Sequence, residues 1–314
     1  MHYTLNDGNV LPAIGFGTYK LTGTNGVRAM VGALNLGYRL LDSAFNYENE
    51  GAVGEAVRQS GIPRSQLIVA SKLPGRHHRY QEAIDTIEES LYRAGLDYYD
   101  LYLIHWPNPK EDLYLEAWQA LIQAQRFGLI RSIGVSNFLP EHIDRLIKET
   151  GVTPAVNQIE LHPYFNQQEQ REYDDAHNIQ TVAWSPLGRG AVLQEPAIKQ
   201  IAATHGKNVG QVILRWDLQH HILPIPKSAH LSRQRTNLDV FDFSLTKDEM
   251  AAIDALTKSD GRLNNQDPAV YQEFNVANQL ILATSIDCIR SISLKRVVAL
   301  LVTAPRLLFL TGSP

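Results

Sequence analysis

Short apolar segments of strand character alternate with segments of helical periodicity along most of this 314-residue chain. About eight strand candidates fall within roughly 250 residues, and no linker or change in composition separates them. This repetition predicts a (β/α)8 TIM barrel, because eight strand-and-helix units of this length close into a ring. A doubly wound sheet is the alternative, since periodicity does not show whether a sheet closes. The candidates are Ile14–Gly17, Arg39–Asp42, Leu67–Lys72, Asp100–His105, Ser132–Ser136, Ala155–Gln158, Thr181–Ser185 and Ile222–Ile225.

The beginning of the chain has a different pattern. Residues 3–17 predict an N-terminal β-hairpin that turns at Asp7-Gly8. A first helical face follows from Val27 to Leu34 and ends at Gly37. Apolar residues in helical spacing predict further helices over Gln81–Ala94, Leu113–Phe127, Pro140–Glu149 and Val209–Gln219.

Composition excludes several classes of protein. The net charge of −4 argues against a nucleic-acid-binding protein, which usually carries a basic surface. The single cysteine, Cys288, excludes an intrachain disulfide and fits a reducing compartment. No apolar run reaches the roughly 20 residues that span a bilayer, and no signal-peptide pattern opens the chain. We therefore expect a cytoplasmic protein. The pairs His77-His78 and His220-His221 lack further ligands at metal-site spacing, so we expect no metal.

Polar or ionisable residues follow the apolar runs at one end of successive strands. Alone, each is an ordinary solvated strand end, but the opposite strand ends carry mainly Gly, Pro and exposed charge. Because barrel enzymes place their chemistry at the carboxyl ends of the strands, this asymmetry predicts a site there. The residues are Asp42, Lys72, His105, Ser136, Asn137, Gln158, Ser185 and Lys227.

A series of ordered motifs resembles the aldo-keto reductase family, in particular its compact bacterial members. The motifs are GYRLLDSAFNYENE, IVASKLP, LYLIHWPNP, GVSNF, NQIELHPY, VAWSPLGRG and IPKS, and the resemblance runs from about Tyr3 to about Phe274. It implies a monomeric barrel enzyme that reduces small carbonyl compounds with a nicotinamide cofactor. Such a barrel binds the dinucleotide without the G-x-G-x-x-G fingerprint, and the nearest string here, GFGTYK, lacks the third glycine.

The resemblance assigns catalysis to Asp42, Tyr47, Lys72 and His105. A carbonyl accepts hydride well only when its oxygen receives a proton or a strong hydrogen bond. Tyr47 is the expected acid, although a free phenol titrates near ~10. The Lys72 ammonium is expected to favour the phenolate, while Asp42 holds Lys72 charged and oriented. His105 is expected to donate to the substrate oxygen.

The resemblance also implies a binding site for the nicotinamide and the pyrophosphate. Amide and hydroxyl groups suit the carboxamide, and an aromatic ring stacks on the nicotinamide. Arg189 adds charge beside the pyrophosphate loop. The implied residues are Ser136, Asn137 and Gln158 for the carboxamide, Trp184 for stacking, and Ser185, Leu187 and Gly188 for the pyrophosphate.

The segment PKSAHLSRQRTN resembles the family's clamp for the adenosine phosphate. Lys227, Ser228 and Arg233 take the positions that bind the 2′-phosphate, and Asn237 takes the position that contacts adenine. Cations favour a phosphate over a ribose hydroxyl, so NADPH is expected rather than NADH. Thr236 departs from the family, which usually has an acidic or amide residue there.

The resemblance places Tyr19, Phe45 and Trp106 in an aromatic substrate pocket, together with His105. Short connections after His105 and Trp184 indicate an open site, so keto-sugar acids, methylglyoxal-like compounds and general carbonyls all fit. Two other classes of function were weighed. The first is a non-catalytic nicotinamide-binding regulatory or structural protein, which loss of a catalytic residue would favour, but all four catalytic residues are present. The second is a phosphate-sugar isomerase, which would not need the stacking ring or the clamp.

The end of the chain departs from the family pattern. We expect a barrel over residues 1–274 and a separate tail over residues 275–314. A membrane anchor is disfavoured, because the longest uncharged stretch, Val297–Pro305, is too short to span a bilayer. A helix over the barrel mouth is a second interpretation. We favour an appended or shifted-frame segment without a partner surface, compatible with disorder, and expect a chain ended at about Phe274 to keep the fold and cofactor binding.

Overall fold

The computed structural model describes residues 1–273 and begins with the predicted hairpin. Strands β1 (His2–Thr4) and β2 (Val10–Pro12) pair antiparallel, with Tyr3 opposite Leu11. The turn uses Gly8 at a φ of 85°, a left-handed conformation that glycine adopts without strain. The prediction for residues 275–314 lies outside the described residues.

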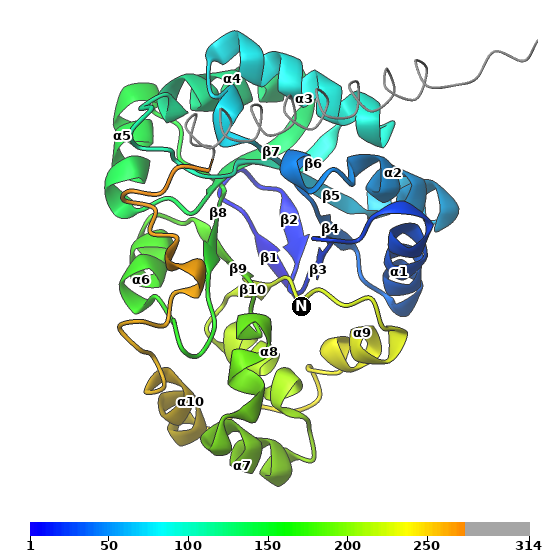
Figure 1. The fold of residues 1–314 in the computed structure, drawn as a ribbon, viewed down its shortest axis with the longest axis vertical. Coiled ribbons are helices and arrows are strands. Elements are labelled where there is room, and N and C mark those ends of the chain that lie inside the picture. Colours follow the sequence, from blue (N-terminus) through cyan, green and yellow to red (C-terminus); the bar gives the residue numbers. More distant parts are fainter. Residues whose placement is uncertain (274–314) are drawn as a thin grey trace, which may run out of the picture. The chain divides into compact units, whose positions relative to one another are not determined.

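The other described strands form one curled parallel sheet, which fits a (β/α)8 barrel (Figure 1). The strands neighbour one another in chain order, as the repeating strand-and-helix pattern predicts. Each observed strand overlaps its predicted range. The strands are β3 (Phe16–Gly17), β4 (Leu40–Asp42), β5 (Ile68–Leu73), β6 (Tyr99–Ile104), β7 (Ile130–Ser136), β8 (Val156–Glu160), β9 (Gln180–Trp184) and β10 (Leu223–Pro224).

Backbone hydrogen bonds also join the two end strands of this sheet. Gly15 N–H donates to Pro224 O at 3.0 Å, and Gly17 N–H donates to Pro226 O at 3.2 Å. Glycine allows this close approach. A Cβ on Gly15 would lie 2.8 Å from Ile225 Cγ2, and one on Gly17 would lie 2.9 Å from Ile225 O. The seam between the first and last strands therefore depends on residues without side chains.

Helices surround the sheet (Figure 1). The four later helices predicted from periodicity begin at or next to the expected residue, whereas α1 begins at Gly23, before the predicted face that starts at Val27. Helix α8 begins with a capping box, which fixes its first residue. Asn208 Oδ1 accepts from Gln211 N–H at 2.9 Å, and Gln211 Oε1 accepts from Asn208 N–H at 3.0 Å. The helices are α1 (Gly23–Leu36), α2 (Glu50–Gln59), α3 (Tyr80–Ala94), α4 (Tyr114–Arg126), α5 (Pro140–Thr150), α6 (Gln168–Ala176), α7 (Pro196–His205), α8 (Val209–Gln219), α9 (Leu231–Leu238) and α10 (Lys247–Asp254).

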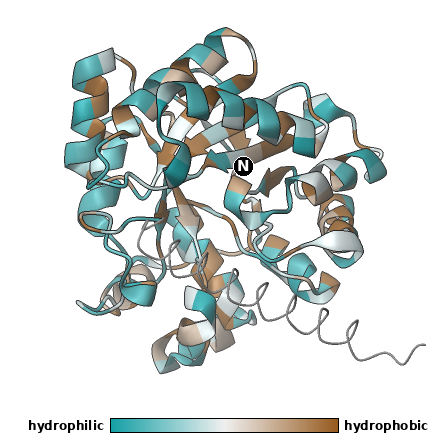
Figure 2. Ribbon diagram, turned by 45° about the horizontal axis from the view of Figure 1, so that its top comes forward, coloured by the Kyte–Doolittle hydropathy of each residue, from teal (hydrophilic) through white to brown (hydrophobic). Residues whose placement is uncertain are grey.

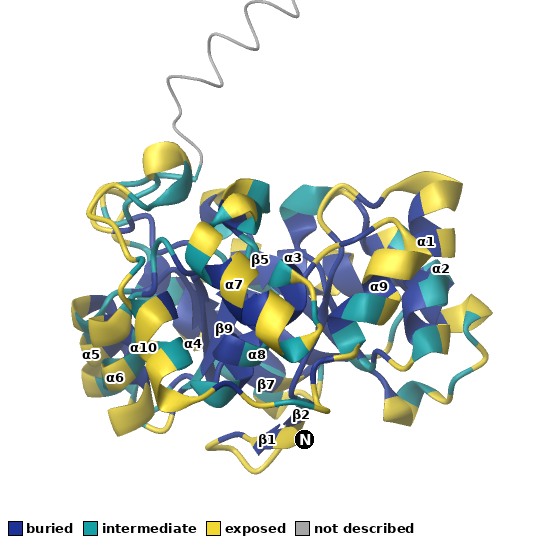
Figure 3. Cartoon of the chain, turned by 90° about the horizontal axis from the view of Figure 1, so that it is seen from below, coloured by how far each residue is buried: buried dark blue, intermediate teal, exposed yellow. Residues whose placement is uncertain are grey.

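The core lies on both faces of the sheet. Every residue of β6 is buried, and Trp118 of α4 and Trp216 of α8 are fully buried. Apolar residues concentrate on the strands and the inner helix faces, whereas the outer helix faces are polar and exposed (Figures 2 and 3). Burial on both faces is typical of parallel sheets, and it gives the strand ends a rigid support.

The contact between α2 and α3 provides a test of this packing. A Cβ on Gly54 would lie 1.7 Å from Ala94 O, so Gly54→Ala should destabilise the fold by about 1–3 kcal/mol through overpacking. Gly51→Ala is the matched control on the same helix. Gly51 is exposed and its Cβ would lie 3.3 Å from Arg93 O, so its effect should stay within about 0.5 kcal/mol. Urea unfolding followed by tryptophan fluorescence measures both, and equal effects would contradict this packing.

Candidate functional site

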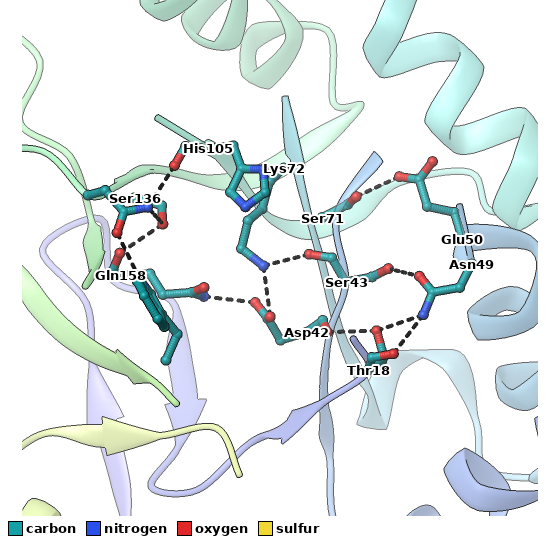
Figure 4. Close-up of polar contacts among 12 residues, drawn as sticks. Thr18, Asp42, Ser43, Asn49, Glu50, Ser71, Lys72, His105, Ser136 and Gln158 are labelled. Atoms are coloured by element: carbon teal, nitrogen blue, oxygen red, sulfur yellow. Dashed lines mark hydrogen bonds and ion pairs between the residues drawn. The ribbon is translucent and has the colours of Figure 1, made fainter. Parts of the chain in front are cut away.

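The predicted polar strand ends converge at one edge of the sheet (Figure 4). Asp42 ends β4, Lys72 lies near the end of β5, and His105 directly follows β6. Ser136 ends β7, and Gln158 lies in β8. Because the strands are parallel and neighbour one another in this order, their carboxyl ends meet at the same edge.

A buried ion pair forms the centre of this site. Lys72 Nζ lies 2.7 Å from Asp42 Oδ2 and donates to Ser43 O at 2.6 Å. Gln158 Nε2 donates to Asp42 Oδ1 at 2.8 Å, so both carboxylate oxygens are engaged. The Lys72 side chain has no exposed surface. Burial lowers the pKa of Lys72, whereas the charge of Asp42 and its hydrogen bond oppose that effect, so the pair is what favours the ammonium.

Tyr47 lies above this pair on a 3-10 helix, Phe45–Tyr47. The Lys72 Nζ lies 5.1 Å from the centroid of its ring, and the rings of Tyr19 and His105 lie 5.0 Å and 5.9 Å away. Burial, followed by the charge of Asp42, raises the pKa of Tyr47 well above its usual value. This direction of the pKa shift is opposite to the expected effect of the ammonium, because burial and the charge of Asp42 disfavour the phenolate. The phenol therefore carries its proton.

A second layer of polar residues supports the site, and sequence reasoning missed it. Asn49 Nδ2 donates to Thr18 O at 2.8 Å, and Asn49 Oδ1 accepts from Ser43 Oγ at 2.7 Å. Glu50 is buried and accepts a hydrogen bond from the Ser71 hydroxyl (Figure 4). These contacts fix the backbone on either side of Asp42 and Lys72. The only sequence signal was the Asn/Glu pair directly after the tyrosine loop.

The residues expected to bind a carboxamide hold one another in place beside this centre. Ser136 Oγ donates to Gln158 O at 2.8 Å, and Asn137 Nδ2 donates to His105 O at 2.9 Å. Trp184 Nε1 donates to Asn137 Oδ1 at 2.8 Å, which orients the half-buried indole. Asn137 has a φ of 62°, a left-handed conformation that asparagine tolerates better than most residues.

The loop expected to bind a pyrophosphate follows β9 directly. Ser185, Gly188 and Arg189 have φ values of 50°, 51° and 51°, and Gly188 N–H donates to Ser185 O at 2.8 Å. Leu187 precedes the 3-10 helix Gly188–Gln194. The exposed Arg189 acts on Tyr47, since its charge works against the raised pKa of that phenol. The loop therefore borders the same site.

The clamp residues follow β10: Lys227 and Ser228 lie in the connection to α9, and Arg233 and Asn237 lie in α9 itself. Lys227 and Arg233 are exposed, whereas Ser228 and Asn237 are buried. Ser228 Oγ accepts from His230 N–H at 3.1 Å, which shapes the turn into the helix. Within residues 1–273, no ion pair involves either exposed cation. Thr236, the departure from the family, donates its hydroxyl to the backbone oxygen of Arg233 at 3.1 Å.

The three aromatic residues that were expected in a substrate pocket have different surroundings. Tyr19 is 49% exposed beside Tyr47, and Trp106 is buried next to His105. Phe45 lies in the same 3-10 helix as Tyr47, and its ring lies 3.9 Å from the Arg93 guanidinium and 5.6 Å from the His77 ring.

The last described segment contributes two residues that sequence reasoning also missed. The Tyr271 ring lies 4.5 Å from that of Trp106, and Glu273 Oε1 lies 2.6 Å from His105 Nδ1. The only signal in the sequence was that this segment still resembles the family pattern.

Neither a metal site nor a membrane-spanning helix is found among the described residues. No three histidine, cysteine or acidic side chains among residues 1–273 are grouped as a metal site would require. Likewise, no helix in that range is long and apolar enough to cross a membrane.

Comparisons with known proteins agree with this geometry. The model of the Aldo/keto reductase family matches residues 13–258. The 2,5-diketo-D-gluconic acid reductase B of Corynebacterium sp. (strain SHS752001) is 53% identical over 271 residues, which cover 86% of this chain and 97% of the relative. An aldo/keto reductase structure from Brucella melitensis is 44% identical, has a TM-score of 0.79, and covers 82% of this chain and 99% of its own. A Gox0644 mutant in complex with NADPH is 39% identical, with a TM-score of 0.83 and coverage of 87% and 98%.

Because Asp42 and Lys72 form a buried ion pair, substitutions at the two positions should have strongly coupled effects on the free energy of unfolding. Asp42→Asn should destabilise the protein by about 3–5 kcal/mol, because Lys72 would stay buried without a counter-charge, and Lys72→Met should act similarly. The double variant should recover most of that loss, since neither charge remains. Urea unfolding of the four proteins gives the coupling energy. Losses that simply add would contradict an interaction between the two side chains.

Proposed function

The chain belongs to the aldo/keto reductase family, and on that premise we propose that it reduces aldehydes or ketones to alcohols with NADPH. The observation that carries the proposal is the buried Lys72–Asp42 pair beneath a protonated Tyr47. This arrangement suits a reaction in which a carbonyl oxygen must receive a proton as carbon receives a hydride. When bound, NADPH supplies that hydride.

In the proposed reaction, Tyr47 is the general acid. Its raised pKa keeps the phenol protonated before the reaction, and negative charge that develops on the carbonyl oxygen draws that proton. Lys72 lies close enough to favour the phenolate that remains, and Asp42 keeps Lys72 charged. His105 donates a second hydrogen bond to the oxygen.

The chain's residues fit the nicotinamide end of NADPH. Gln158 Nε2 is engaged by Asp42, so its side-chain oxygen is the part available to accept from the carboxamide amino group. Ser136 and Asn137 are fixed beside it, and the half-buried Trp184 indole offers a face for stacking. Ser185, Leu187 and Gly188 are proposed to hold the pyrophosphate.

The clamp fits the other end of the cofactor. Lys227 and Arg233 are exposed cations outside any ion pair of the described residues, so their charge is available for the 2′-phosphate. Ser228 and Asn237 are proposed to complete the contacts with the phosphate and the adenine.

The proposed substrates are small carbonyl compounds. Tyr19, Phe45 and Trp106 are proposed as aromatic walls of the pocket, together with His105. Keto-sugar acids, methylglyoxal-like compounds and general aldehydes remain candidates, and the Corynebacterium relative is a 2,5-diketo-D-gluconic acid reductase by name. A non-catalytic nucleotide-binding role is disfavoured, because all four proposed catalytic residues are present and assembled. A monomeric state and a cytoplasmic location stay predictions.

Tyr47→Phe tests the acid role. Removal of a positioned acid should lower kcat by about 10²–10⁴-fold, while NADPH affinity stays nearly unchanged. A carbonyl substrate panel followed by NADPH absorbance measures the rate, and fluorescence titration measures binding. Tyr92→Phe, at an exposed position on α3, is the matched control. A Tyr47→Phe enzyme that kept more than about a tenth of the wild-type kcat would not fit the assignment.

Arg233→Ala tests the clamp. Loss of a charge-assisted contact to phosphate should weaken NADPH binding by roughly 1.5–3 kcal/mol, or about one to two decades in Kd, and should affect NADH far less. Arg235→Ala, an exposed change on the same helix, is the control. Equal losses for NADPH and NADH would show that Arg233 does not read the 2′-phosphate.

A further inference from the structure

Glu273 brings a buried carboxylate to the rim of the proposed reductase site. Its side chain is 8% exposed, although it lies near the end of the described chain. Asn46 Nδ2 donates to Oε1 and Gly75 N–H donates to Oε2, both at 2.6 Å. The backbone N–H of Glu273 donates to Asn108 Oδ1 at 3.0 Å. These partners come from the segments that follow β4, β5 and β6, so the carboxylate and the backbone N–H of this one residue connect three loops around the site.

The same carboxylate contacts the imidazole of His105. Glu273 Oε1 lies 2.6 Å from Nδ1, which is buried from solvent. At this distance the carboxylate forms an ion pair with the ring when the ring is charged. Burial disfavours the carboxylate anion, but the charge of His105, the Gly75 N–H and the Asn46 amide outweigh burial and hold the pKa of Glu273 below its ordinary value. The carboxylate is therefore ionised.

An ionised carboxylate beside one ring nitrogen favours particular protonation states of the ring. A neutral imidazole carries one proton, and if that proton is on Nδ1 facing Glu273, Nε2 has none to donate. The doubly protonated ring carries a proton on each nitrogen, and a nearby negative charge stabilises it. Beside Glu273, only this charged ring both faces the carboxylate with Nδ1–H and offers Nε2–H to a substrate.

We propose that Glu273 is a positioning residue that holds the His105 ring through Nδ1 and favours its doubly protonated form, so that Nε2–H donates to the carbonyl oxygen. The proposal rests on the proposed reduction, and Glu273 acts through His105. The charge also opposes ionisation of Tyr47. The other titratable groups on which the Glu273 charge acts are Lys72, Arg76, His78 and Tyr271.

In a purely structural role, Glu273 would only hold its own segment in place through its hydrogen bonds. Three variants of the full chain distinguish this role from an effect on His105. Glu273→Gln keeps the size of the side chain and one acceptor oxygen but removes its charge. Glu273→Asp keeps the charge. Asn108→Gly removes the acceptor of the Glu273 N–H without altering the carboxylate, and glycine suits the φ of 47° at that position.

The direct readout is nitrogen NMR of protein labelled with ¹⁵N-histidine, with His105 assigned by substitution. At pH 7, Glu273→Gln should reduce the doubly protonated fraction of the His105 ring. Glu273→Asp should preserve more of that fraction, and Asn108→Gly should leave it at the wild-type level. This measurement needs neither cofactor nor turnover.

Kinetics supply the second readout. With NADPH and a carbonyl substrate, Glu273→Gln should lower kcat/KM by about tenfold or more, with a larger loss at pH 8 than at pH 6, while NADPH affinity is unchanged. Asn108→Gly should not change the pH profile. The pH profile of kcat/KM does not distinguish an effect on His105 from one on Tyr47, because the charge of Glu273 acts on both groups. The NMR measurement reports on His105 alone and therefore decides between them.

Two results would overturn the proposal: an unchanged protonated fraction in Glu273→Gln, or an equal decrease in Asn108→Gly. If Glu273→Gln does not fold, a wild-type-like fraction in Glu273→Asp supports the role of charge, and a lost fraction contradicts it. An NMR response in a protein that reduces no carbonyl would support the action of Glu273 on His105 and contradict the proposed reduction.

Discussion

A lysine whose side chain has no exposed surface is the constraint on which the rest of this site depends. An ammonium buried without a partner costs several kcal/mol, so Lys72 requires the Asp42 carboxylate at 2.7 Å. Asp42 requires donors in turn, and Gln158 supplies one from a strand on the far side of the site. The charge that the proposed proton transfer uses is therefore also a folding requirement, which is met only when the strands are in register.

Much of this arrangement was predictable from the sequence because it follows from local periodicity. Strand β6 reads as an apolar run that ends at His105, and the parallel topology then places that end beside Lys72. The contacts made by side chains were not predictable in this way. Gln158 reaches Asp42 across 116 positions of sequence, and Glu273 reaches Asn46 across 227. No local pattern encodes such pairings, which depend on where the completed fold brings each loop.

The balance of charge around Tyr47 shows the same limit of sequence reasoning. Lysine and tyrosine at neighbouring strand ends indicated an ammonium acting on a phenol, but the sequence did not show how strongly Asp42 and Ser43 engage that ammonium. Nor did it place Glu273 near enough to oppose ionisation of Tyr47. The resting site therefore holds its proton on the phenol, which is the form that a reduction requires.

The glycine seam between the two end strands has a consequence for how the protein forms during synthesis. Gly15 and Gly17 hydrogen-bond to Pro224 and Pro226, so the first strand of the parallel sheet is synthesised long before the last strand with which it pairs. Contacts so distant in sequence slow folding, because a long chain must close before they form. Until then, a nascent chain exposes unpaired strand edges that favour association with other chains. The pairing of the first and last strands of the sheet therefore sets how long the nascent chain exposes these edges, which is the period in which chaperones protect a chain from association.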